Sequence, residues 1–178
     1  MFLDRFFRPK PATLAGRALY DAAAVQARQA FFYTDLGAPD TLEGRFELYT
    51  LHVVLLLDRL RQAGAQAAEV RQAVFDAYVR GLDDALREIG VADTSVGKKM
   101  KKLAGAFYGR LRAYEAAFAG LPDRAELDAL IGRTVFGDDQ DGRAAALAAY
   151  AVTARGRLAD QPAESLIEGR APAWPAAA

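Results

Sequence analysis

Apolar side chains recur at intervals of three and four residues along most of the chain, whereas strand-like alternation is scarce. Such spacing places apolar side chains on one face of an α-helix. Glycine and proline separate the periodic stretches, and both residues interrupt helices. The pattern predicts an all-α protein, a single compact domain of about six to seven helices. The predicted helices cover residues 12–30, 40–62, 67–88, 93–119, 123–134, 141–159 and 162–168.

Composition changes at both ends of the chain. The start, MFLDRFFRPK, mixes bulky apolar with charged residues, and the end, APAWPAAA, is rich in proline and alanine. We expect an N-terminal amphipathic segment at 1–10, a helical domain at 11–170 and a C-terminal tail at 171–178. The first segment lacks the apolar core of a secretory signal, and no apolar run is long enough to span a bilayer. Its candidates for contact with a membrane surface are Phe2, Leu3, Phe6, Phe7 and Arg8. The alternative is that this segment docks on the domain.

The segment FFYTDLGAPD, residues 31–40, is predicted to be a loop because Gly37 and Pro39 break helical periodicity. Loops expose side chains that helices bury, so the large apolar residues here are candidates for binding a partner. These candidates are Phe31, Phe32, Tyr33 and Leu36. The alternative is that they fold back on the core. Asp40 and Glu43 have the spacing of a capping box, which predicts that the next helix begins there.

The stretch VGKKMKKLAGAFYGRL, residues 96–111, carries four lysines within five residues. On a helix, Met100, Leu103 and Phe107 share an inward face, and the basic residues lie broadly opposite. Glycines among those basic residues permit close approach of another helix. The outward candidates for partner binding are Lys98, Lys101, Lys102, Gly105, Tyr108, Gly109 and Arg112. An unoccupied solvated face and contact with anionic lipid headgroups are the alternatives.

Composition argues against most catalytic and nucleic-acid-binding functions. The 23 Lys and Arg residues balance the 23 Asp and Glu residues, so no global field recruits nucleic acid, and we expect no specific nucleic-acid partner. The chain has no cysteine and a single histidine, His52. His52 lies within an apolar helix and is predicted to be a hydrogen-bonded core residue. Phosphate-loop, dinucleotide-binding and nucleophile-elbow motifs are missing. We therefore expect no catalytic residue, metal site or cofactor, and a non-enzymatic role.

Several short blocks resemble the ubiquinol–cytochrome c chaperone family. Their order and spacing carry the resemblance, because no single block is specific. The blocks are Pro39-Asp40-Thr41-Leu42 with Phe46 and Leu51-His52-Val53; Gly90-Val91 with Lys98-Lys99-Met100; Phe107-Tyr108 with Tyr114 and Glu115; and Gly169 with Trp174.

The resemblance implies an all-α, non-enzymatic chaperone that binds newly made cytochrome b and assists assembly of the cytochrome bc1 complex. It implies contact with cytochrome b or other bc1 subunits, and the mitochondrial members work with a small accessory assembly protein near the ribosomal exit tunnel, which makes an accessory protein and the ribosome further candidate partners here. This chain departs from mitochondrial members at Arg45, where they tend to have Trp, and at Lys101 and Lys102, which they lack. These departures indicate a different partner-binding surface.

Cytoplasmic residence is the default expectation for a bacterial chain of this kind, with a position at the inner-membrane surface as its extension. The alternative function is a peripheral membrane or lipid-binding helical module. Such a module would use the N-terminal segment and the basic face between Lys98 and Arg112.

Overall fold

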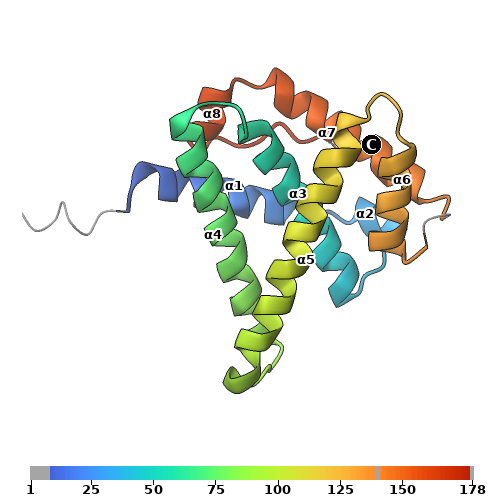
Figure 1. The fold of residues 1–178 in the computed structure, drawn as a ribbon, viewed down its shortest axis with the longest axis horizontal. Coiled ribbons are helices and arrows are strands. Elements are labelled where there is room, and N and C mark those ends of the chain that lie inside the picture. The colour runs from blue at the N-terminus through green and yellow to red at the C-terminus, as the bar shows by residue number, and fades with distance from the viewer. Residues whose placement is uncertain (1–8, 139–140, 177–178) are drawn as a thin grey trace, which may run out of the picture.

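The computed structural model describes residues 9–138 and 141–176 (Figure 1). Every regular element within these ranges is a helix, which confirms the predicted all-α class. Six of the α-helices have seven or more residues, and they pack as one compact domain. The elements are α1 (Pro11–Ala27), α2 (Phe31–Thr34), α3 (Leu42–Leu60), α4 (Ala65–Glu88), α5 (Asp93–Ala119), α6 (Ala125–Ile131), the π-helical segment η1 (Gly132–Phe136), α7 (Ala144–Asp160) and α8 (Ala163–Ile167).

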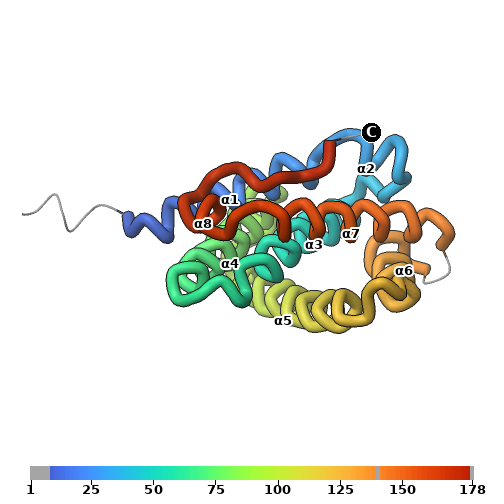
Figure 2. Tube along the Cα trace, turned by 90° about the horizontal axis from the view of Figure 1, so that it is seen from above, coloured from blue at the N-terminus to red at the C-terminus, as the bar shows by residue number. Residues whose placement is uncertain are grey.

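Helix α3 forms the centre of the core. It contacts α1, α4, α5, α7 and η1, and Figure 2 shows it between α5 and the C-terminal helices. The run from Val53 to Leu57 is buried without interruption. A helix that is apolar on most sides must be surrounded by other elements, so the sequence of α3 accounts for its central position.

Helices α4 and α5 form an antiparallel hairpin whose tip projects from the body of the molecule (Figure 1). Gly90 makes the turn with φ +80°, a conformation that glycine adopts without strain. On its other side, α4 packs against α1. A Cβ at Gly16 of α1 would overlap Ala73 of α4, so these helices approach closely only because position 16 has no side chain.

Two local predictions around the start of α3 are wrong. Phe31–Thr34 form the short helix α2 within the predicted loop. The cap of α3 is Thr41, whose hydroxyl accepts a hydrogen bond from the Gly44 amide at 3.1 Å. Asp40 instead accepts a hydrogen bond from Arg45 at 2.6 Å. Thr41 takes the capping role because its extended backbone directly precedes the first helical residue.

The described part of the C-terminal tail, residues 171–176, is not helical and packs along the domain. Trp174 stacks edge-on against His52, with the ring centroids 5.2 Å apart. The five predicted membrane-contact residues, Phe2, Leu3, Phe6, Phe7 and Arg8, lie outside the described residues.

Candidate functional site

An apolar groove of about 270 Å³ lies where α1, α3 and α4 meet. Leu82, Leu86 and Ile89 line it from the α4 side, while Leu42 and Phe46 line it from α3. The C-terminal half of α4 carries this lining because its apolar stripe runs on from Leu82, which packs against the core, through buried Leu86 to exposed Ile89. The groove is therefore an extension of the core packing that no element of the described structure covers.

Two residues at the edge of the groove are unusually exposed for their type. Leu42 and Ile89 each have 55% of their surface exposed to solvent. Leu42 begins α3, and Ile89 caps the end of α4. Single exposed apolar residues are common, but two beside an apolar recess make the recess a candidate binding surface.

Tyrosines form the other end of the groove. The rings of Tyr20 and Tyr49 lie 6.1 Å apart, and the Tyr33 hydroxyl donates a hydrogen bond to the Ala27 carbonyl at 3.0 Å. Burial is the main cause that raises the pKa of all three hydroxyls. These tyrosines are therefore neutral at physiological pH and offer polar but uncharged groups to a ligand.

Gly81 provides the space for one of these tyrosines. A Cβ at this position would overlap the Tyr20 hydroxyl, so the side chain of Tyr20 lies directly against the backbone of α4. The Arg28 guanidinium lies over the Tyr49 ring, 5.4 Å from its centroid. The tyrosine end of the groove thus carries a cation, and the α4 end is apolar.

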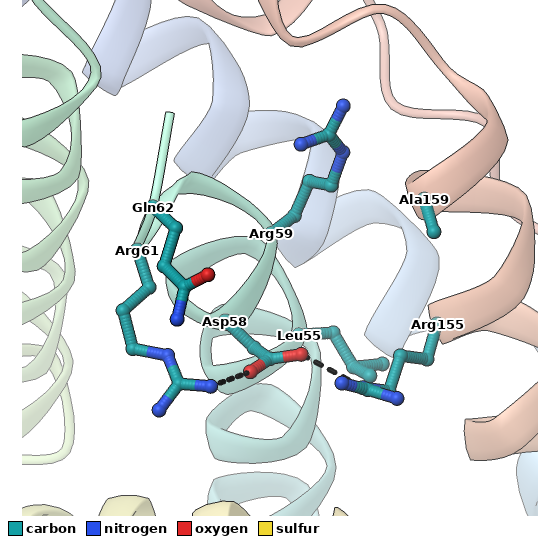
Figure 3. Close-up of a pocket in the computed structure, with 7 residues that line it drawn as sticks. All are labelled: Leu55, Asp58, Arg59, Arg61, Gln62, Arg155 and Ala159. Atoms are coloured by element: carbon teal, nitrogen blue, oxygen red, sulfur yellow. Dashed lines mark hydrogen bonds and ion pairs between the residues drawn. The ribbon is translucent and has the colours of Figure 1, made fainter. Parts of the chain in front are cut away.

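A second recess of about 320 Å³ lies between the C-terminal ends of α3 and α7 (Figure 3). Its centre is Asp58, which Arg155 contacts at 2.8 Å and Arg61 at 3.4 Å. Arg59 points away from this pair in Figure 3 and donates hydrogen bonds to the carbonyls of Leu158 and Gln161. The two ion pairs satisfy the Asp58 carboxylate. The bonds from Arg155 and Arg59 tie α3 to α7, so the arrangement stabilises the fold.

The predicted aromatic site at residues 31–36 is divided by the structure. Phe32 is completely buried and packs against the rings of His52 and Tyr150. This is a correction, because α2 turns Phe32 into the core and removes it from the surface. Phe31 and Leu36 are partly buried against the core, whereas Tyr33 lines the groove.

The predicted basic face of α5 points outward. Phe107 is buried, as expected for the inward side, and Leu103 reaches the groove. The seven outward candidates are all exposed: Lys98, Lys101, Lys102, Gly105, Tyr108, Gly109 and Arg112. Across residues 9–138 and 141–176, the lysine side chains of this face form no ion pair. A Cβ on Gly105 or Gly109 would meet nothing within 4 Å beyond its own helix backbone. A partner could approach this face closely.

Sequence reasoning missed Arg28, Leu42 and Ile89 as site residues. The available signal was weak: two large apolar residues directly beside helix ends, where neighbouring helices cover less surface. None of the described helices combines the length and apolar character needed to cross a membrane. The residues that the structure describes contain no group of three or more His, Cys, Asp or Glu side chains that could hold a metal ion.

Comparisons with known proteins agree on one family. A model of the ubiquinol–cytochrome C chaperone family matches residues 34–174. Among solved structures, the crystal structure of the Cbp3 homolog from Brucella abortus is similar, with 35% sequence identity and a TM-score of 0.80. That match covers 95% of this chain and 94% of the other. A comparison with curated proteins gave no match. The family match spans most of the chain, including α3, α4 and α5, and the protein therefore belongs to the ubiquinol–cytochrome c chaperone family.

Proposed function

We propose that this protein is a non-enzymatic assembly chaperone that binds newly made cytochrome b and assists assembly of ubiquinol–cytochrome c reductase, the bc1 complex. Membership of a chaperone family supports the general role. The observation that supports a client site is the apolar groove, with Leu42 and Ile89 exposed beside it. Newly made membrane proteins present apolar helices, and an amphipathic or apolar helix binds most readily in an apolar groove.

Only part of the predicted aromatic segment contributes to the groove. Tyr33 reaches the groove from α2, but Phe32 serves the core. Leu103 brings the inward edge of the lysine-rich stretch to the same place. The proposed client site therefore combines one residue from each predicted region with residues of α1, α3 and α4.

A crosslinking experiment tests the client site. The chain has no cysteine, so Ile89→Cys creates a unique attachment point for a photoactivatable crosslinker at the groove. We expect light-dependent crosslinks from the full-length protein to cytochrome b in cells that are assembling the bc1 complex. The matched control is Glu164→Cys, an exposed position on α8 outside the groove. Normal bc1 content in a deletion strain, together with no difference between the two crosslinking positions, would contradict the proposal.

A second candidate function is peripheral association with the inner-membrane surface from the cytoplasmic side. The specific observation is the outward face of α5, where the lysines have no ion-pair partners in the described structure. Basic residues on one helical face are attracted to anionic headgroups. The same face is our candidate for binding a small accessory assembly protein, other bc1 subunits or the ribosome. The two functions are compatible, because a chaperone for a membrane protein can work beside the bilayer.

A further inference from the structure

We propose that the groove prefers an apolar helix that carries a carboxylate, and that Arg28 binds this carboxylate. The inference rests on the proposed function and specifies the chemistry of the client segment. Arg28 follows the last residue of α1 and lines the tyrosine end of the groove. Among the described residues its side chain makes no hydrogen bond or ion pair. Its guanidinium makes a cation–π contact with the Tyr49 ring.

The acids nearest this end of the groove already have partners. Asp21 pairs with Arg17 at 3.8 Å, and Asp40 pairs with Arg45 at 2.6 Å. Arg28 is left with a positive charge that no described residue balances. The tyrosine end of the groove is therefore electropositive.

The charge of Arg28 acts on the three tyrosines at once. Burial raises the pKa of Tyr20, Tyr33 and Tyr49, and the positive charge of Arg28 acts in the opposite direction at each of them. Of the three rings, the guanidinium lies over that of Tyr49. At Tyr33 the charge of Arg45, which also lines the groove, has a larger effect than that of Arg28. The Tyr33 hydroxyl already donates its one proton to the Ala27 carbonyl, so the guanidinium is the main donor left for a carboxylate, and it can bind both carboxylate oxygens.

The apolar end sets the second requirement. A purely apolar helix would fill the side lined by Leu82, Leu86 and Ile89 but would leave the exposed Arg28 without a partner of opposite charge. A helix with a lysine in that place would meet like charge. A helix with an acidic residue beside its apolar face can fill the apolar end of the groove and pair with Arg28 at the other end. The charge at that one position of the helix therefore discriminates among client segments.

The extent of the apolar surface favours a helix over a single lipid chain. Leu42 and Ile89 are each 55% exposed and enlarge the apolar area beyond the recess itself. A helix buries a row of side chains at intervals of three and four residues. It can cover the recess and both edge residues together, whereas an acyl chain in the recess would leave the edges exposed.

Binding of designed peptides to the full-length protein tests the inference. The probes are three fluorescent Leu/Ala-rich helical peptides, identical except for one Glu, Gln or Lys beside the apolar face. Anisotropy at low salt should show the Glu peptide binding about tenfold more tightly than the Gln peptide, with the Lys peptide weakest. Arg28→Gln should reduce the difference between Glu and Gln to about twofold or less, and Arg28→Lys should retain part of it.

The control is Arg80→Gln, which removes the same charge from an exposed position on α4 outside the groove. It should leave the preference for the Glu peptide unchanged. The inference is overturned if Arg28→Gln keeps the full preference, if the three peptides bind equally, or if oleate binds the groove and none of the peptides does. Each of those results leaves the chaperone proposal standing if Ile89→Cys still crosslinks to cytochrome b. Conversely, loss of that crosslink with an intact Glu preference would overturn only the choice of client.

Discussion

His52 is a neutral base in the centre of the core, held by hydrogen bonds on both ring nitrogens. Its Nδ1 lies 2.7 Å from the Leu48 carbonyl oxygen, which can only accept, so Nδ1 carries the proton. Its Nε2 accepts from the Tyr150 hydroxyl at 2.8 Å, and Gln26 donates to that hydroxyl at 3.2 Å. The prediction of a hydrogen-bonded core histidine is confirmed, and no potential donor or acceptor remains on the ring for a metal.

Burial of His52 makes the stability of the protein depend on pH. Desolvation lowers the pKa of His52 from 6.5 to about 4. Between about pH 6.5 and 4, His52 is protonated in the unfolded chain but remains neutral in the folded chain. The free energy of unfolding therefore falls as pH falls from about 6.5 toward 4. The full difference amounts to about 3 kcal/mol. Urea unfolding at several pH values, followed by the fluorescence of the single Trp, should show this slope.

His52→Gln is the matched variant, because the amide can still hydrogen-bond but does not titrate. It is less stable at neutral pH, since its shape differs from that of the imidazole in a fully buried position. Its free energy of unfolding should nevertheless depend less on pH between 6.5 and 4 than that of the wild type. Equal slopes in the two proteins would show that His52 does not contribute.

At the scale of elements, one ion pair joins the central helix to the hairpin. Arg110 of α5 donates two hydrogen bonds of 2.8 Å each to the Glu47 carboxylate of α3. The Glu47 side chain is 7% exposed and that of Arg110 is 31% exposed. Two-point binding fixes both the distance and the rotation of the helices, and the hydrogen bond to Glu47 is the main cause that raises the pKa of Arg110.

Arg110→Met should destabilise the protein by about 2 kcal/mol, because it leaves a buried carboxylate without its partner. The value lies below that for a fully buried pair because Arg110 is partly exposed and solvent screens its charge. Adding Glu47→Leu to this variant should recover most of the lost stability, measured by urea unfolding. A double variant that is less stable than Arg110→Met would contradict the explanation. Arg87→Met, which breaks only exposed pairs, should change stability little.

The existence of the long helices could be predicted from the sequence, but their ends could not always be. Apolar periodicity and flanking glycines located α3, α4 and α5, because helical geometry converts spacing directly into a buried face. The cap of α3 was misassigned because Asp40 and Thr41 are both good capping residues. The choice between them depends on the backbone angles of Thr41 and on Arg45 attracting Asp40. Such competition between neighbours is decided by the folded geometry.

At the scale of the whole molecule, the groove could not be read from the sequence. It brings together residues as distant as Tyr20, Phe46, Ile89 and Leu103. Each of these residues fits a local pattern that also describes an ordinary core position. Only the packing of α1 against α4 shows which apolar residues the core leaves uncovered. The basic face of α5 was predictable by contrast, because one helix contains it completely.

Lys98, Lys101 and Lys102 are exposed on α5 and do not line the groove, so membrane contact can be tested separately from client binding. Each lysine near an anionic surface contributes about 1 kcal/mol of attraction, and salt screens this attraction. We expect the full-length protein to float with vesicles rich in phosphatidylglycerol at low salt and to be released at high salt. Lys98→Gln with Lys101→Gln should weaken this binding at least about tenfold.

The matched control for the lysine variant is Arg133→Gln with Arg157→Gln, which removes the same charge from exposed positions outside α5. If net charge alone governed binding, both double variants would bind equally weakly, and the α5 face would have no special role. Removal of residues 1–10 measures the separate contribution of the N-terminal segment. A protein that ignores anionic vesicles at low salt would eliminate the membrane function but leave the groove and its crosslinking test unaffected. The outward lysines would then be assigned to a protein or ribosomal partner, since their exposure and lack of ion pairs in the described structure would still favour an anionic surface.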